Sequence, residues 1–330
     1  MHRGIFTRTR RDFLAVSGTA LLLAGLGMPA LARGASPTRS IRGTAFETTW
    51  QATLPDAAPA DKLGVPIASL LAAIDRKMSP WRADSELSRF NQGPAGSVAV
   101  SAETGLVATV GLDIARASQG AFDPSVGPLV RRWGFGPITG SGIGSWQGLS
   151  ARETELGKSD DGLTLDLCGI AKGRALDRMA DQLTAAGHGD FLIDLGGELL
   201  ARGRHPDGRP WQVGIEDPRP SAAGLSARLA LKNRAIATSG LRANGYEFSG
   251  QRYSHIIDPR TREPVAGDLL SVSVVASDAM TADGWATALL AAGDAGPGLA
   301  AERGLAAMFQ FRDGRGLLRA TTGRFESDLL

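Results

Sequence analysis

The sequence has 330 residues with 36 basic and 34 acidic side chains, so its formal net charge at pH 7 is only +2. This balance does not favour a nucleic-acid partner, which would require a clustered basic surface. The single cysteine excludes an internal disulfide and any multi-cysteine metal site, and the four histidines argue against a histidine-rich metal centre.

The first 32 residues have the order of an export signal. Arg10 and Arg11 precede an apolar run from Leu14 to Leu26, and the Ala30-Leu31-Ala32 triplet is typical of a cleavage site. The run is shorter than the roughly 20 residues that a membrane-spanning helix needs. We therefore expect a twin-arginine signal peptide over residues 1–32, cleavage near Ala32 and a periplasmic protein. Removing this segment takes away four Arg and one Asp, so the mature chain is nearly neutral.

The remaining chain is expected to contain both helices and strands. Residues 33–43 are rich in polar residues and glycine, which predicts a flexible linker, and residues 44–330 are expected to form one domain. Apolar periodicity predicts helices over 62–77, 101–120 (with Ser101 and Thr104 as possible caps), 174–186 and 279–292. Strand-like stretches are 43–55, 190–203, 211–218, 226–240, 254–259 and 269–277. The strands of the second half do not alternate regularly with helices, which favours an α+β fold with mixed or antiparallel sheets and flanking helices.

The stretch DLCGIAKGRALDR, residues 166–178, follows a strand-like run and leads into a predicted helix. A helix start offers free backbone N–H groups, and Gly169 allows the chain to approach an anion closely. Lys172 lies at the same turn. The stretch is therefore either a phosphate site or an ordinary strand-to-helix turn.

Asp283 and Thr287 are four residues apart in a predicted helix, so their side chains share one face. Oxygen ligands of this kind suit Mg²⁺. The alternative is that Asp283 is a first-turn acid that complements the helix dipole and that Thr287 is an ordinary helix threonine.

Seven stretches, in the same order, resemble the ApbE family of exported bacterial flavin transferases. They are KMSPWRADSELSRFN (77–91), GAFDPSVGPLVRRWGFG (120–136), DLCGIAKGRALDR (166–178), FLIDLGGEL (191–199), AIATSG (235–240), YSHIIDPRT (253–261) and MTADGWATAL (280–289). The resemblance implies an ApbE-like fold over roughly residues 46–310. It also implies that FAD is the substrate, that Mg²⁺ is the cofactor, and that the FMN half of FAD is transferred to a Thr or Ser hydroxyl of a target protein with release of AMP.

The resemblance also implies a role for individual residues. Mg²⁺ would be bound by the backbone carbonyl of Gly169 and by the side chains of Asp283 and Thr287, which makes Asp283 a catalytic residue. Lys172 would contact the pyrophosphate, and Asp166 would contact FAD through adenosine or ribose hydroxyls. Further FAD contacts are expected from Met78, Ala121, Phe122, Asp123 and Ile256.

The resemblance implies that His255 lies near the active site, where it would accept the proton of the reacting hydroxyl, position the substrate or form a structural hydrogen bond. A histidine suits the first role because it can accept a proton near neutral pH. Asp258 or a metal-bound water are the alternative bases. The sequence departs from the family at Cys168, which we expect to be a buried small side chain, with an oxidisable thiol as the alternative. It also departs after the TSG turn, where Leu241 and Arg242 replace an aromatic residue, which indicates an altered rim for the protein substrate.

The residues leave other functions open. A FAD pyrophosphatase would use the same pocket with water as the nucleophile, and a non-catalytic carrier would only bind FAD. The motif DLCGIAKG is similar to that of family members linked to nitrous-oxide reductase maturation. The resemblance to these members implies a target that is a membrane flavoprotein with its acceptor domain in the periplasm.

Overall fold

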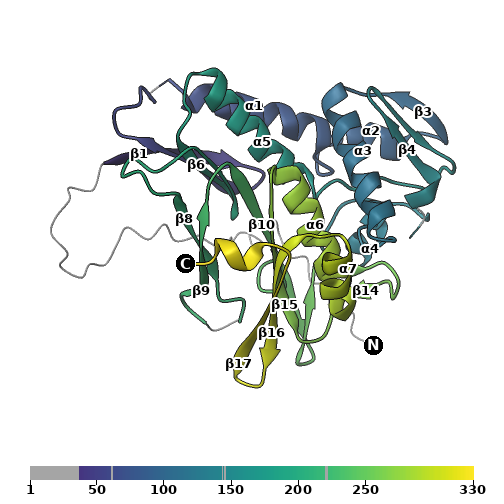
Figure 1. Cartoon of the computed structure of the whole chain (residues 1–330). Coiled ribbons are helices and arrows are strands. Elements are labelled where there is room, and N and C mark those ends of the chain that lie inside the picture. The colour runs from purple at the N-terminus through teal and green to yellow at the C-terminus, as the bar shows by residue number, and fades with distance from the viewer. Residues whose placement is uncertain (1–36, 61, 143, 145, 220–221) are drawn as a thin grey trace.

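An eight-stranded sheet forms the centre of the protein (Figure 1). The structure is a computed structural model that describes residues 37–330 except 61, 143, 145, 220 and 221. Every neighbouring pair of strands in this sheet is antiparallel. In spatial order the strands are β1 (Thr38–Ala45), β2 (Thr48–Pro55), β6 (Phe191–Leu195), β7 (Glu198–Arg202), β10 (Arg234–Gly240), β15 (Leu269–Ala276), β16 (Ala306–Asp313) and β17 (Gly316–Thr322). The predicted α+β class is confirmed.

Strand β1 corrects the prediction of a linker over residues 33–43. The strand begins at Thr38 and pairs with β2 along its whole length, so the prediction was wrong for residues 38–43. Polar side chains are compatible with this edge strand because they bond across it, as Ser40 Oγ does with Thr53 Oγ1 at 3.0 Å. A Cβ at Gly43 would lie 2.7 Å from the Trp50 indole, so glycine makes room for that ring.

Helices cover one face of the sheet (Figure 1). Helix α6 (Ala279–Ala291) packs on β10 and β15, α5 (Ala171–Ala185) packs on β6 and β7, and the two helices contact each other. Helix α1 (Gly64–Met78) lies against α5, and α3 (Ala102–Ala117) lies against α6. The Glu103 carboxylate links α3 to α5 because it accepts hydrogen bonds from Arg174 and Arg178.

The opposite face of the sheet is also buried. Successive strand side chains point to opposite faces, so Ile193 joins the core beneath the helices while Leu192 joins a second core. That second core is covered by a hairpin of β8 (Trp211–Glu216) and β9 (Leu225–Leu231), together with Phe325 near the C-terminus. The sheet therefore has a helix-covered face and a hairpin-covered face.

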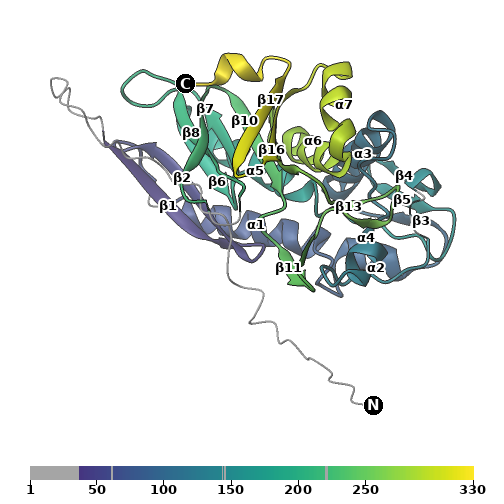
Figure 2. The ribbon, with the colours of Figure 1, turned by 90° about the horizontal axis from the view of Figure 1, so that it is seen from below.

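The smaller elements lie around this frame. Figure 2 shows β3, β4, β5, α2 and α4 grouped at the end of the molecule opposite β1. These elements and the others are α2 (Glu86–Gln92), α4 (Gly127–Arg132), α7 (Gly296–Glu302), η2 (Trp146–Gly148), η3 (Gly293–Ala295), η4 (Phe325–Asp328), β3 (Gly96–Ala99), β4 (Leu149–Arg152), β5 (Glu155–Lys158), β11 (Gly245–Phe248), β12 (Gln251–Ser254), β13 (Ile257–Asp258) and β14 (Glu263–Pro264).

The four predicted helices are confirmed as α1, α3, α5 and α6. Ser101 is the cap of α3, since its hydroxyl accepts a hydrogen bond from the Thr104 N–H. The strand expected over 43–55 is instead a hairpin, because Phe46 and Glu47 have positive φ and form its turn. The strand expected over 254–259 is reduced to the two residues of β13 after the end of β12.

No helix in the described part of the chain is both long enough and apolar enough to cross a membrane. The predicted signal peptide, residues 1–32, lies outside the described residues.

Candidate active site

Helix α6 meets helix α5 and the turn before it along three contacts, each four residues from the next, which we call the ladder. A Cβ at Gly169 would lie 3.0 Å from the Thr287 side chain, which is the first contact. The Gly173 N–H donates to Asp283 Oδ2 at 2.9 Å, which is the second. Asp177 accepts hydrogen bonds from the first N–H groups of α6, including that of Ala279 at 2.7 Å, which is the third. The glycines at 169 and 173 thus allow α6 to approach the turn closely.

The three residues predicted to bind Mg²⁺ come together in this ladder. Thr287 Oγ1 lies 3.4 Å from the Gly169 carbonyl and 3.3 Å from Ser239 Oγ, while Asp283 lies one helical turn before Thr287. No described residue donates a hydrogen bond to Asp283 Oδ1. A carboxylate, a hydroxyl and a carbonyl are hard oxygen ligands, so this set fits a divalent cation. The described residues contain no cluster of three His, Cys, Asp or Glu side chains that could bind a metal differently.

Lys172 lies beside this set, as the resemblance implies. Its Nζ donates to Glu198 Oε1 at 2.6 Å. Burial alone would lower the pKa of Lys172, but the carboxylates of Glu198 and Asp283 outweigh burial and raise it. Lys172 is therefore charged, and its side chain as a whole is 35% exposed.

The Asp283 carboxyl is buried in an acidic environment. Burial and the nearby Glu198 carboxylate raise its pKa to about 7, against the opposing effects of Lys172 and the Gly173 N–H. The described part of the site thus carries excess negative charge next to one lysine. A divalent cation would compensate this charge, which is a second reason why the residues fit one.

His255 is half-buried, and its ring orientation is fixed by the backbone. Its Nδ1 lies 3.1 Å from the Asn244 carbonyl, which can only accept a hydrogen bond, so Nδ1 carries the proton. This leaves Nε2 with a free lone pair. Burial and, to a smaller extent, the Lys172 ammonium lower the pKa of His255 to about 4, although the Asn244 carbonyl opposes the shift. The imidazole is therefore neutral at pH 7 and able to accept a proton.

Asp258, the alternative base, is already bound to an arginine. Its two carboxylate oxygens accept hydrogen bonds from Arg260 Nε at 3.0 Å and Arg260 Nη2 at 2.9 Å, and its Oδ1 also accepts from the Arg260 N–H. Both oxygens of this carboxylate are occupied by charge-assisted hydrogen bonds, whereas Nε2 of His255 keeps a free lone pair. The structure therefore favours His255 over Asp258.

The predicted FAD contacts surround the same turn. Phe122 is buried, and its ring would lie 3.2 Å from a Cβ at Gly169. Asp123 is buried and accepts two hydrogen bonds from Ser125, while burial raises its pKa. Asp166 donates its N–H to the Pro124 carbonyl at 2.7 Å and accepts from the Cys168 N–H; burial also raises its pKa. The AFD triplet and the lysine turn are thus adjacent.

Three predicted FAD contacts have ordinary packing in the structure. Met78 is buried in the core at the end of α1, and Ala121 is buried beside Phe122. Ile256 is half-buried, and its carbonyl accepts the Val265 N–H at 2.8 Å. Their contact with FAD stays a prediction.

Cys168 differs from the expectation of a buried side chain, because the structure places it at an exposed position. Cys168 lies at the outer side of the turn, between buried Leu167 and half-buried Gly169. Burial of its sulfur and the adjacent Asp166 carboxylate raise the pKa of the thiol well above its ordinary value. The thiol is therefore protonated at neutral pH.

A column of aromatic rings leads to His255. Trp133 stacks on Tyr253 at 5.5 Å between ring centroids, Tyr253 stacks on Tyr246, and Tyr246 stacks on Phe135. Phe135 then makes an edge contact with the His255 ring at 6.3 Å. The column fixes the β11–β12 hairpin against the segment that follows α4, and so stabilises the position of His255.

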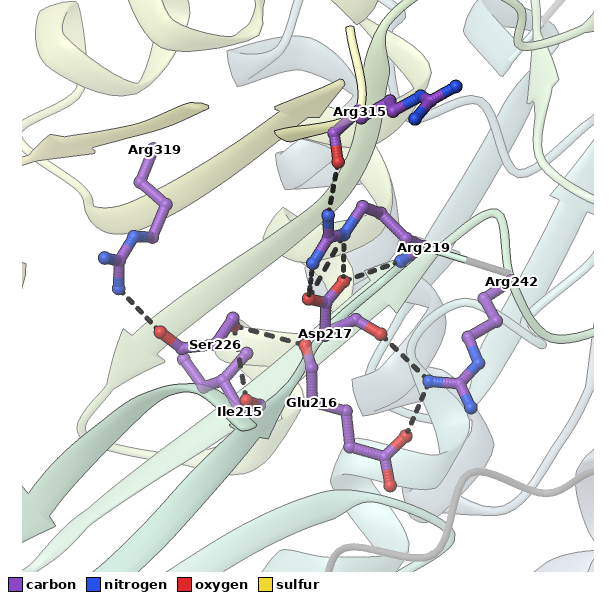
Figure 3. A network of polar contacts seen from close by, with 8 residues as sticks. All are labelled: Ile215, Glu216, Asp217, Arg219, Ser226, Arg242, Arg315 and Arg319. Carbon is purple, nitrogen blue, oxygen red and sulfur yellow. Dashed lines mark hydrogen bonds and ion pairs between the residues drawn. The ribbon is translucent and has the colours of Figure 1, made fainter. Parts of the chain in front are cut away.

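Arg242, one of the departures from the family, belongs to a polar network at the end of β10 (Figure 3). Its Nη1 donates to the Asp217 carbonyl at 2.9 Å and lies 3.7 Å from Glu216 Oε2. Hydrogen bonds from Arg219 lower the pKa of the Asp217 carboxyl, and Arg219 also donates to the Arg315 carbonyl. The network joins the β8–β9 hairpin to β10 and to the β16–β17 turn.

Glu198 is a site residue that the sequence analysis did not identify. It belongs to the stretch FLIDLGGEL, in which it is the only charged residue after the double glycine and begins the apolar strand β7. A charge at the start of a buried strand is the signal that could have identified it, because such a charge requires a partner.

Comparisons with known proteins identify the family of the chain. The ApbE family model matches residues 46–309. The FAD:protein FMN transferase of Vibrio cholerae is 36% identical and the match covers 90% of each chain. The protein of the same name from Klebsiella pneumoniae is 32% identical over 96% of this chain and 97% of its own.

Solved structures show the same fold. The flavin transferase ApbE from Vibrio cholerae superposes with a TM-score of 0.80 at 32% identity and covers 89% of this chain and 99% of its own. The apo flavinyl transferase ApbE of Pseudomonas stutzeri has a TM-score of 0.78 at 31% identity and covers 88% and 96%. Because the family model spans most of the sequence and these relatives cover nearly all of it, the chain belongs to the ApbE family.

Proposed function

We propose that the protein transfers FMN from FAD to a Thr or Ser hydroxyl of an acceptor protein and releases AMP. The observation that carries this proposal is the convergence of Asp283 and His255 on Lys172, whose ammonium lowers the pKa of both groups. Relatives named FAD:protein FMN transferase support the same activity. A working site of this kind favours an enzyme over a passive FAD carrier.

The residues divide the reaction between them. The acceptor oxygen forms a bond to the phosphorus of the FMN half, and the bond from that phosphorus to the bridging oxygen breaks, so that AMP leaves with that oxygen. His255 Nε2 accepts the hydroxyl proton, which the neutral imidazole allows at pH 7. Lys172 stabilises negative charge on the pyrophosphate.

The cation site would lie at the Gly169 carbonyl, Asp283 and Thr287. A bound Mg²⁺ would supply Lewis-acid stabilisation of the phosphate oxygens. Asp283 is the only charged side chain of the three and therefore provides most of the attraction for a cation.

The test is incubation of the purified protein with FAD, Mg²⁺ and a candidate acceptor, followed by mass spectrometry of the acceptor. We expect the acceptor mass to increase by one FMN and AMP to appear in equal amount. AMP release with no modified acceptor would indicate a pyrophosphatase, and bound, unchanged FAD would indicate a carrier.

The cation ligand is tested by Asp283→Ala. We expect turnover to fall by at least about 100-fold, because a charged ligand is lost from a phosphoryl-transfer site. Asp313→Ala, at an exposed position on β16, is the matched control and should transfer FMN normally. Equal transfer by Asp283→Ala and wild type at limiting Mg²⁺ would contradict the assignment.

The protein is exported by the twin-arginine route and acts in the periplasm, and its acceptor is a membrane protein with a periplasmic acceptor domain. The support is the sequence of residues 1–32 and the similarity of DLCGIAKG to the nitrous-oxide reductase maturation branch. Replacing Arg10 and Arg11 by Lys should leave unprocessed protein in the cytoplasm. Normal periplasmic accumulation of this double variant would reject the route.

A further inference from the structure

Glu198 is a buried carboxylate that has no part in the transfer step described above. It begins β7 directly after Gly196 and Gly197, whose positive φ angles of 63° and 101° form the tight turn between β6 and β7. Its side chain is only 6% exposed, and Oε1 accepts from Lys172 Nζ at 2.6 Å. Oε2 is buried and has no hydrogen-bond partner among the described residues. A buried carboxylate is costly without compensation, and the Lys172 ammonium is the compensation that the described chain provides.

Lys172 is influenced by two carboxylates but pairs with only one of them. Both Glu198 and Asp283 interact electrostatically with its ammonium. Within the described chain, however, Lys172 forms an ion pair with Glu198 and none within 4.0 Å with Asp283. Asp283 Oδ1 consequently receives no hydrogen bond from a described residue. A lysine near two buried carboxylates can neutralise either one. The carboxylate with which Lys172 pairs therefore determines whether Asp283 has an oxygen free for a cation.

We propose that Glu198 is a positioning residue that keeps Lys172 away from Asp283. In this arrangement Asp283 keeps an oxygen free for the divalent cation, and Lys172 is aimed at the pyrophosphate of FAD. The inference rests on the proposed function, because it assumes that a cation binds at Asp283. If the Glu198 charge is removed, Lys172 turns to Asp283 and competes with the cation for that carboxylate.

A double-mutant cycle on cation binding tests this role without measuring catalysis. The four proteins are wild type, Glu198→Gln, Lys172→Met and the double variant, and both substitutions nearly preserve side-chain volume. Mn²⁺ affinity is measured by the electron paramagnetic resonance signal of free Mn²⁺ in the absence of FAD. The Asp283→Asn variant, which lacks the charged ligand, gives the level of binding outside the proposed site. Thermal unfolding followed by circular dichroism verifies that each variant is folded.

The cycle separates competition from simple charge effects. If Glu198 and Lys172 only add their charges to the field at the cation, the effect of Lys172→Met is the same in both backgrounds. If Glu198 restrains Lys172, we expect Glu198→Gln to weaken Mn²⁺ binding about 10-fold or more and Lys172→Met to restore it in that background. In the wild-type background Lys172→Met should change the affinity by only about 3-fold or less.

Each outcome decides the inference. Non-additive restoration in the double variant supports it. Additive effects, or wild-type Mn²⁺ affinity in Glu198→Gln, overturn it and leave the proposed transfer reaction intact. If wild type binds no more Mn²⁺ than Asp283→Asn, the cation site of the proposed function is wrong, and the inference is rejected with it.

Discussion

The hydrogen bond between His255 and the Asn244 carbonyl determines which ring nitrogen can act. Because the carbonyl accepts, Nδ1 carries the proton and Nε2 is the acceptor. The bond also explains how the ring keeps its orientation with only a half-buried side chain, since the Asn244 carbonyl additionally accepts the His255 backbone N–H at 3.1 Å. A single carbonyl thus anchors both the backbone and the side chain of the proposed base.

The lowered pKa of His255 predicts an unusual pH profile for the transfer. The base is active when neutral, so activity should rise with pH through about 4 and be constant above about 5, where the imidazole is deprotonated. The measurement is kcat/KM for FMN transfer between pH 4 and 8 at saturating Mg²⁺, so that a bound cation keeps Asp283, whose own pKa is raised to about 7, ionised over this range. An acid limb near the ordinary histidine pKa of about 6.5 would contradict the assignment.

The companion variant is His255→Ala, which should reduce turnover about 100-fold or more while FAD still binds. His188→Ala is the control, because His188 follows α5 and has no part in the site. Partial rescue of His255→Ala by added imidazole would separate loss of the base from loss of structure.

At the scale of elements, the α5–α6 contact depends on glycine. A Cβ at Gly173 would lie 2.3 Å from the Ala279 carbonyl and 2.8 Å from Asp283 Cβ, and both are parts of helix α6 that cannot move independently. The helix must therefore shift if residue 173 gains a side chain. The consequence would reach Asp283 first, because the Gly173 N–H is its hydrogen-bond donor.

We expect Gly173→Ala to lower the free energy of unfolding by about 1–3 kcal/mol, as overpacking of a close contact does. Gly298→Ala is the matched control, since Gly298 lies in α7 with nothing within 4 Å of an added Cβ. The control should be neutral or slightly stabilising because alanine favours helix. Denaturant unfolding measures both, and equal stability of the two variants would show that the helices do not rely on this approach.

The sequence predicted those features that depend on local periodicity or on the family motifs. The four main helices, the pairing of Asp283 with Thr287 and the approach of Lys172 to the site all follow from spacing or resemblance. Long-range partners were not predictable, because nothing local specifies that Glu198 meets Lys172, 26 residues away. Strand β1 was missed because its polar residues resemble a linker until the register with β2 is known, and the exposure of Cys168 depends on how the turn faces solvent.

At the scale of the whole molecule, the sheet separates a functional face from a structural one. Asp283 and Lys172 come from the helices on one face, whereas the hairpin β8–β9 and Phe325 cover the other. Phe325 is fully buried, although it lies only five residues from the C-terminal Leu330. The segment that contains Phe325 therefore packs on the second core rather than on the site.

This division predicts that Phe325→Ala is destabilising but not inactivating. Truncating a fully buried phenylalanine typically costs about 3–5 kcal/mol of unfolding free energy. The folded fraction should retain the FAD affinity and turnover of wild type, because the sheet lies between Phe325 and the helices. The measurements are denaturant unfolding and FMN transfer at a temperature where the variant is folded, and a large loss of turnover per folded molecule would contradict the separation.

The site forms only when α5 and α6 are correctly aligned along the ladder. Its contacts pair residue 169 with 287, 173 with 283 and 177 with 279, so each step forward on one helix is a step backward on the other. A slide of α6 by one residue would turn its side chains by about 100° and misplace all three pairs at once. Only one relative position of the two helices therefore forms all three residue pairs. A chain that folds with this pair misaligned would lack the proposed cation site, so cation binding would distinguish the correctly assembled molecules.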